Sequence, residues 1–142
     1  MRGDKVFLDT NILVYAHDTS AGDKHAIALR IVKDLWASGL GVLSTQVLQE
    51  FFAIATKKIP KPLDISEAKE IIRVLLKWPV VVNNGNSILD AIDIHSRYKY
   101  SFWDSMIIES AGRGGASLLL SEDLNDGQTM DGVVIRNPFL NP

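Results

Sequence analysis

"FLDTNILVY", residues 7–15, begins as an apolar run that Asp9, Thr10 and Asn11 interrupt. Together with the residues before it, this stretch predicts a strand over 5–9 of the continuous apolar kind that is buried on both faces of a parallel sheet. Ligands of such sheets bind beyond the carboxyl ends of the strands. Asp9 is therefore either the N-cap of a helix that begins at Asn11 or a functional carboxylate.

The rest of the chain alternates short β-rich runs with longer helical patterns. Strands are predicted over 41–45, 80–83, 117–121 and 132–137, and helices over 21–38, 46–59, 66–78, 86–99 and 101–113. Strands separated by helices form a mostly parallel sheet through right-handed crossovers, with helices on both faces. The prediction is an α/β fold, a three-layer α/β/α sandwich with a mostly parallel central sheet of about five strands.

Composition limits the classes of protein to consider. A chain of 142 residues with 46% hydrophobic and 23% charged residues is typical of one globular domain. The net charge of -2 lacks the strongly basic balance of many nucleic-acid-binding proteins, and the absence of cysteine excludes disulfides and thiolate metal sites. No leader precedes the first strand and no apolar run is long enough to span a membrane, so we expect a cytoplasmic protein without a membrane partner.

Four acidic residues from distant parts of the chain are candidates for one site. Asp9 ends the first strand, Glu50 lies in the first turns of the helix after the second strand, and Asp123 follows the strand at 117–121. Asp104 lies in the first turn of a helix that can present its N-terminus at the same sheet edge. At roughly 4 Å and an effective dielectric near 20, two like charges repel by about 4 kcal/mol, so such a cluster requires a cation or bound protons.

The type of ligand indicates which cation. Carboxylate oxygens suit Mg²⁺ or Mn²⁺, whereas His17, His25 and His95 are scattered over helical patterns and do not support a zinc site. The chemistry that these residues indicate is the metal-assisted hydrolysis of a phosphodiester.

Each acid also has an ordinary structural interpretation. Asp104 comes three residues after Ser101, so "SFWD" is a capping box with Asp in place of Glu. Asp123 and Asp126 lie in "SEDLNDG", where turn chemistry accounts for both. Glu50 alone would be a solvated residue of an amphipathic helix. Only the combination of the four acids favours a site.

The acids lie in four blocks that follow one another along the chain: "FLDTNILVYA", "QVLQEFFAIA", "SFWDSMIIESA" and "LLLSEDLNDGQTMDGVVIRNPF". These blocks resemble the successive blocks of PIN-domain ribonucleases, specifically the VapC-like toxins of type II toxin-antitoxin modules. The resemblance spans almost the whole chain. It implies a single PIN-like nuclease domain over 1–142 and a metal-dependent endoribonuclease that is the toxin of a toxin-antitoxin pair.

The resemblance also implies a role for each acid. The catalytic residues would be Asp9, Glu50, Asp104 and Asp123. Of these, Asp9, Asp104 and Asp123 would be the principal ligands of one or two Mg²⁺ or Mn²⁺ ions, and Glu50 would bind a second ion or orient the attacking water. Supporting positions are Thr10, Asn11, Ser121 and Asp126, although only some relatives have a further acid where Asp126 stands. Glu122 is expected to point away from the site.

The implied partners are an RNA substrate, a cognate antitoxin that inserts an amphipathic segment beside the site, and a second copy in a homodimer. Candidate apolar residues for these protein contacts are Trp36, Phe51 and Phe52, each of which core packing explains equally well. The only compact basic stretch is "KKIPK", with candidate RNA-binding residues Lys57, Lys58 and Lys61. A solvated helix end explains these lysines too. The target stays open among tRNA, rRNA, mRNA and single-stranded DNA.

Rival classes fit the sequence less well. A haloacid-dehalogenase-like phosphatase needs a second aspartate two residues after the first, where this chain has Asn11. A response-regulator receiver domain needs an acidic pair near the end of the first strand and a lysine after the last, and "GVVIRN" has none. A catalytically silent PIN-like module that binds RNA or protein is the third alternative, against which the complete set of acids argues.

Overall fold

A six-stranded sheet forms the centre of the structure, a computed structural model that describes residues 4–140. The strands are β1 (Lys5–Leu8), β2 (Gly41–Ser44), β3 (Val80–Val81), β4 (Ala116–Leu120), β5 (Thr129–Met130) and β6 (Val133–Arg136). Their order in the sheet is β3-β2-β1-β4-β6-β5, and every pairing is parallel except that of β5 with β6. The carboxyl ends of β1, β2 and β4 therefore meet at one edge.

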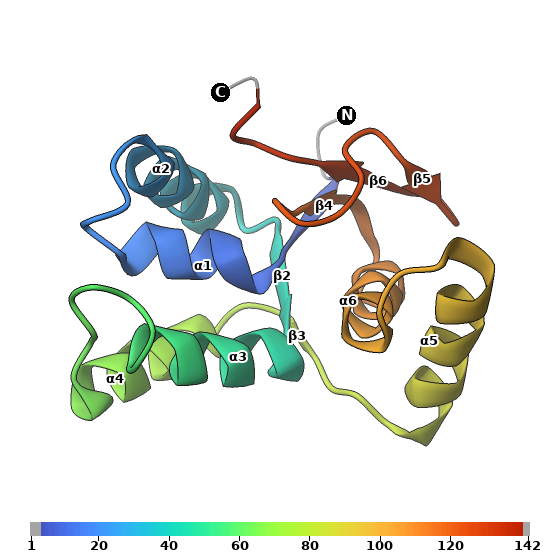
Figure 1. Ribbon diagram of the computed structural model, residues 1–142, viewed down its shortest axis with the longest axis horizontal. Helices are drawn as coiled ribbons and strands as arrows, with labels where there is room; N and C mark the ends of the chain where they lie inside the picture. Colours follow the sequence, from blue (N-terminus) through green and yellow to red (C-terminus); the bar gives the residue numbers. More distant parts are fainter. Residues whose placement is uncertain (1–3, 141–142) are drawn as a thin grey trace.

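Helices cover both faces of this sheet (Figure 1). On one side lie α1 (Thr10–His17), α2 (Asp23–Ser38), α3 (Thr45–Ala55) and α4 (Ile65–Leu75), and on the other α5 (Gly85–Tyr98) and α6 (Phe102–Arg113). From β1 the chain adds β2 and then β3 toward one edge of the sheet, and α5 and α6 lead back to β4 on the other side of β1. Right-handed crossovers in these two opposite directions place the two sets of helices on opposite faces. The predicted three-layer α/β/α sandwich is confirmed. Among residues 4–140, no helix is long and apolar enough to cross a membrane.

The sheet differs from the prediction at its last strand. The predicted strand over 132–137 begins only at Val133, because Asp131 and Gly132 both have positive φ, 50° and 85°, and form the tight turn of a hairpin. The antiparallel partner in that hairpin is the two-residue strand β5, which the sequence analysis missed. A strand of two residues is too short to show a periodic pattern.

Two helices are shorter than predicted. The helix expected over 46–59 ends at Ala55, where the Thr56 hydroxyl donates to the Phe52 carbonyl (2.6 Å), and Lys57 and Lys58 form a turn. The helix expected over 66–78 ends at Leu75, and Trp78 instead packs over Gly41, where an added Cβ would lie 2.3 Å from the indole. The first helix therefore ends at a local side-chain bond and the second where Trp78 packs on Gly41, each before the prolines.

The core lies between the sheet and its helices. Strands β1, β2 and β4 and the inner faces of α1, α3 and α6 supply its largest fully buried apolar residues, which include Phe7, Leu8, Ile12, Leu13, Leu43, Phe51, Ile107 and Leu119. Phe51 is completely buried, with its ring edge-on to His17 at 5.3 Å. Its predicted role in an exposed groove or interface is therefore wrong, whereas Trp36 and Phe52 are partly exposed. Helical periodicity could not separate the adjacent residues Phe51 and Phe52.

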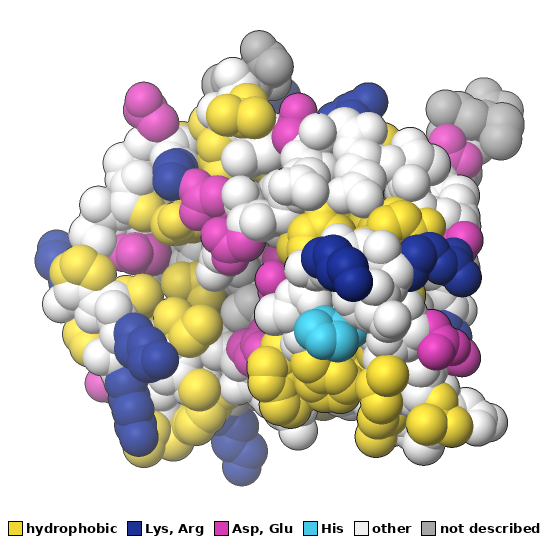
Figure 2. Space-filling model, turned by 45° about the vertical axis from the view of Figure 1, so that its right-hand side comes forward, with side chains coloured by type: hydrophobic (Ala, Val, Ile, Leu, Met, Phe, Trp, Pro, Cys, Tyr) yellow, Lys and Arg dark blue, Asp and Glu magenta, His cyan; other side chains and the backbone are white. Residues whose placement is uncertain are grey.

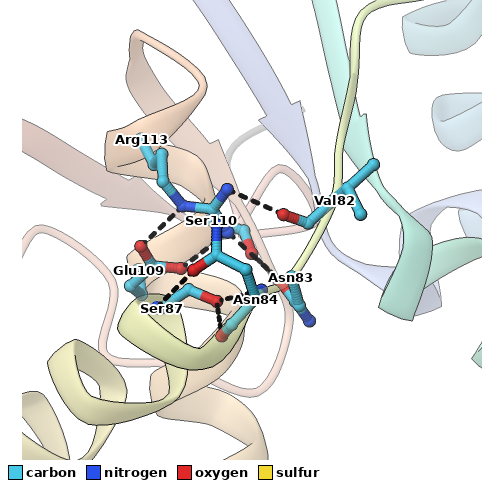
Figure 3. Close-up of polar contacts among 7 residues, drawn as sticks. All are labelled: Val82, Asn83, Asn84, Ser87, Glu109, Ser110 and Arg113. Carbon is cyan, nitrogen blue, oxygen red and sulfur yellow. Dashed lines mark hydrogen bonds and ion pairs between the residues drawn. The ribbon is translucent and has the colours of Figure 1, made fainter.

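A polar network holds the connection between β3 and α5 against α6 (Figure 3). Arg113 donates Nε and Nη2 to the two carboxylate oxygens of Glu109 (2.8 and 3.1 Å) and Nη1 to the Val82 carbonyl (2.8 Å). The Asn83 amide oxygen accepts from the Ser110 hydroxyl (3.2 Å) and from Arg113 Nη2 (3.3 Å). This network fixes the C-terminal half of α6, and with it the direction in which the N-terminus of α6 points.

We expect the Arg113→Ala variant to lose about 3 kcal/mol of unfolding free energy, because it leaves the buried Glu109 carboxylate without its charged partner. The matched control is Arg73→Ala, which removes an exposed ion pair with Glu70 on α4 and should leave the unfolding free energy nearly unchanged. Urea unfolding of both variants measures the difference. Equal, small losses would show that the network does not hold α6.

Candidate active site

Asp9 lies between β1 and α1, where it is only 6% exposed. Its Oδ1 accepts a hydrogen bond from the backbone N–H of Thr10 (2.7 Å), so the carboxylate caps α1. Its Oδ2 accepts from the hydroxyl of Ser121 (2.7 Å), the residue that follows β4. Because β4 is the neighbour of β1 in the sheet, this bond joins two strand ends directly. Asp9 thus has the structural role of an N-cap and also faces the edge of the sheet where ligands bind.

Glu50 is drawn to the same edge from α3. The Thr10 hydroxyl donates to Glu50 Oε1 (2.6 Å), and the Gln46 amide nitrogen donates to Glu50 Oε2 (3.3 Å) and to the Trp103 carbonyl (3.2 Å). Gln46 therefore ties α3 to the first turn of α6. The sequence analysis missed Gln46, although its spacing of four residues from Glu50 places both on one helix face.

Asp104 occupies the first turn of α6. Its backbone N–H donates to the hydroxyl of Ser101 (3.1 Å), which gives one arm of the expected capping box. Burial raises the pKa of the Asp104 carboxyl. A hydrogen bond between the side chains of Ser101 and Asp104 opposes this increase, and the charges of Asp123 and Glu50 add to it. The carboxylate of α6 therefore lies within electrostatic reach of acids from two other segments.

Asp123 completes the group from the loop after β4. The Asn11 amide nitrogen donates to Asp123 Oδ2 (2.6 Å), and the Asp123 backbone N–H donates to the Ser121 hydroxyl (3.2 Å). Ser121 thus contacts both Asp9 and Asp123. The neighbouring Glu122 points away as predicted and accepts from the Tyr15 hydroxyl (2.7 Å) while it pairs with Lys24.

The remaining predicted site residues lie outside this group. Asp126 accepts a hydrogen bond from the backbone N–H of Asn137 (2.8 Å), so its carboxylate fastens the loop to the segment after β6. The exposed Lys57, Lys58 and Lys61 follow the C-terminal end of α3, whereas Glu50 lies more than a turn earlier. Neither Asp126 nor the three lysines are among the groups that shift the pKa of Asp9 or Asp104.

Neighbouring acids add to the shift in the pKa of Asp9. Burial raises the pKa of Asp9 to about 6, hydrogen bonds from Ser121 and Thr10 oppose the increase, and the charges of Asp104 and Glu50 add to it. Acidic side chains lie along the hollow between the helices of the two faces (Figure 2). The site is therefore a concentration of negative charge that favours a cation or protons.

The residues present suit a hydrated divalent ion. Within residues 4–140, no three Asp, Glu or His side chains are arranged so that they could hold a metal ion as they stand. Mg²⁺, however, commonly keeps several of its waters and binds through only one or two protein carboxylates. Oxygen donors alone surround the position, which fits Mg²⁺ or Mn²⁺ held partly through water.

Comparisons with known proteins identify the family and the fold. A family model of the PIN domain matches residues 6–125. Among solved structures, the chain is similar to VapC20 of Mycobacterium tuberculosis, described as a sarcin-ricin loop cleaving toxin, with a TM-score of 0.62, 19% identity and coverage of 81% of this chain and 87% of that chain. No curated protein matches the chain.

Two further solved structures are similar over most of their length. For a toxin-antitoxin complex from Klebsiella pneumoniae the TM-score is 0.68 at 16% identity, with 94% of this chain and 98% of that chain covered. For VapBC2 of Rickettsia felis, bound to a DNA fragment from its promoter, the TM-score is 0.64 at 14% identity, with 93% and 97% covered. At such low identity these similarities describe the fold.

The raised pKa of Asp9 predicts how stability without metal depends on pH. In the folded protein Asp9 keeps its proton up to about pH 6, whereas in the unfolded chain its pKa is 3.8. The folded state therefore loses stability relative to the unfolded state as the pH rises from about 4 through 6. The wild type should lose up to about 3 kcal/mol relative to Asp9→Asn between pH 4 and pH 7. Melting curves of both proteins in EDTA test this. Parallel curves would mean that Asp9 is not electrostatically strained.

Proposed function

We propose that this chain, which belongs to the PIN-domain family, is a Mg²⁺- or Mn²⁺-dependent endoribonuclease and the toxin of a toxin-antitoxin pair. The observation that carries the proposal is the convergence of Asp9, Glu50, Asp104 and Asp123 at the carboxyl edge of the sheet. Capping of α1 accounts for Asp9 alone, and the four carboxylates repel one another without a cation. A site of this kind suits a substrate whose reacting group is a phosphodiester.

Some of these residues would bind the metal, and others would orient the attacking water or a metal ligand. Asp9, Asp104 and Asp123 would hold the ion or ions, which supply charge neutralisation of the phosphate and an activated water. Glu50, whose two oxygens accept from Thr10 and Gln46, is held in one orientation and would position the attacking water. Ser121 donates to Asp9 and so orients its carboxylate. The expected products carry a 5'-phosphate and a 3'-hydroxyl.

An antitoxin is the proposed protein partner. The support is a mostly apolar groove of about 210 Å³ between α2 and α4, lined by residues that include Val32, Trp36, Ile71 and Leu75. An apolar groove between helices is the kind of surface that accepts the apolar face of an amphipathic helix. Two structures of similar fold, a toxin-antitoxin complex and VapBC2, support such a partner. A second copy of the chain remains a separate prediction, for which the exposed Ile88, Leu89 and Ile92 of α5 are candidate contacts.

We expect the purified protein to cleave structured RNA with Mg²⁺ or Mn²⁺ and to be inactive in EDTA. Asp9→Asn and Asp104→Asn should each slow cleavage at least about a hundredfold, because each removes a charged ligand and keeps the side-chain shape. Glu122→Gln is the matched control, since this acid faces Tyr15 and Lys24 and should retain near-normal activity. Gel analysis of labelled RNA measures the rates. Full cleavage activity in EDTA would show that the reaction does not depend on a metal ion.

Binding of the ion can be tested without a substrate. In EDTA at neutral pH, Asp123→Asn should melt no lower than the wild type, because the substitution relieves repulsion within the acid cluster. Mn²⁺ at about 100 times its Kd should stabilise the wild type by about 2.7 kcal/mol and the variant less, since an ion that binds only the folded state shifts the equilibrium.

Glu122→Gln again serves as the control and should respond to Mn²⁺ as the wild type does. If Mn²⁺ shifts neither the wild type nor Asp123→Asn, and the variant is simply less stable, Asp123 is a turn residue and the proposed cluster does not bind metal.

A further inference from the structure

Trp103 is an exposed aromatic residue in the first turn of α6, directly before Asp104. It is 63% exposed, compared with 40% for Trp36 and 36% for Phe52. Single apolar residues on a surface are common and need no explanation by themselves. The position of this indole, one residue from an acid of the candidate site, is what makes it informative.

The backbone of Trp103 is fastened to the acid cluster. Its carbonyl accepts a hydrogen bond from the side-chain amide of Gln46 (3.2 Å), and the same amide nitrogen donates to Glu50 (3.3 Å). Gln46 is only 5% exposed. Its ring packs edge-on against Phe102, with the ring centroids 5.1 Å apart. These contacts hold the backbone and the ring of Trp103 directly before Asp104, and the residue remains largely exposed to solvent.

The negative charge of the acids opposes RNA binding, and contact with this indole would offset that repulsion. The acids repel the phosphate backbone, and the compact lysine group at 57, 58 and 61 lies beyond the end of α3 rather than among them. An uncharged contact with the substrate would therefore add to the affinity that metal ions held by the acids give to the phosphate. Stacking of a base on an aromatic ring is uncharged and is a common source of affinity for single-stranded nucleic acid.

We propose that Trp103 is the base-stacking residue of the RNA site, on which an unpaired base next to the scissile phosphate lies. This proposal rests on the proposed ribonuclease function and adds one contact that positions the substrate. The base must be unpaired, because a paired base does not expose its face. Apolar surface lies beside the acidic hollow on the side of α5 and α6 (Figure 2). The position of Trp103, one residue before Asp104, favours the substrate as occupant over a second copy of the chain.

The experiment compares Trp103→Ala and Trp103→Phe with Ile65→Ala, a control that removes an apolar side chain 71% exposed at the start of α4. Binding is measured by fluorescence anisotropy of a labelled 12-nucleotide single-stranded RNA in Mg²⁺, with all proteins in an Asp9→Asn background that prevents cleavage. Cleavage of the same RNA is measured in the wild-type background as KM and kcat.

We expect Trp103→Ala to weaken binding and raise KM about tenfold, since stacking on one base is lost. Trp103→Phe should recover most of the affinity because it restores a ring, and Ile65→Ala should bind as the parent does. All variants should keep the melting temperature of the parent, because the side chains removed are exposed. Affinity of Trp103→Ala equal to the parent, or of Trp103→Phe as low as that of Trp103→Ala, would overturn the proposal.

Two further results separate this proposal from the nuclease function. If Trp103→Ala binds normally while the wild type cleaves RNA with Mg²⁺, stacking is wrong and the nuclease stands. If Trp103→Ala weakens binding but no RNA is cleaved with metal, stacking stands and the nuclease is wrong. Light scattering provides the last check, because a change of oligomeric state in Trp103→Ala would assign the indole to an interface between two copies and overturn the proposal.

Discussion

The buried carboxylate of Asp9 is the interaction on which the rest of the site depends. One oxygen caps α1 through Thr10 N–H, and the other accepts from Ser121 at the end of the neighbouring strand. Two strand ends and one helix N-terminus are therefore joined through a single side chain. Because Ser121 also accepts from the backbone of Asp123, and Thr10 donates to Glu50, the other acids are positioned relative to this one.

This arrangement places like charges close together where two strand ends and a helix N-terminus are joined. A carboxylate that is desolvated and close to other acids destabilises the metal-free protein, and the apolar core must compensate for it. The Arg113 network contributes by holding α6 from its far end, so that Asp104 does not move away from Glu50 and Asp123. Strain of this kind is common where a fold is built around a functional site rather than for stability alone.

Structural and functional roles coincide in the first turns of the helices. Asp9 caps α1, and Ser101 caps the helix that presents Asp104, so the residues that begin these helices also place charge at the sheet edge. Solved structures of similar fold share fewer than one residue in five with this chain. Such a fold tolerates wide change because it depends on buried strands and crossovers, which many apolar residues can form.

The sequence by itself determined the layers, the positions of the main strands and the acids at their ends, because periodicity and capping are local properties of the chain. It also indicated that Glu122 turns away from the site, since neighbouring residues alternate in direction. Tertiary structure alone decided that Phe51 enters the core while Phe52 stays at the surface, that Asp126 binds Asn137 rather than the acids, and that Gln46 joins Glu50 to Trp103. The physical reason is that these outcomes depend on contacts between segments distant in sequence, whose free energies no local pattern contains.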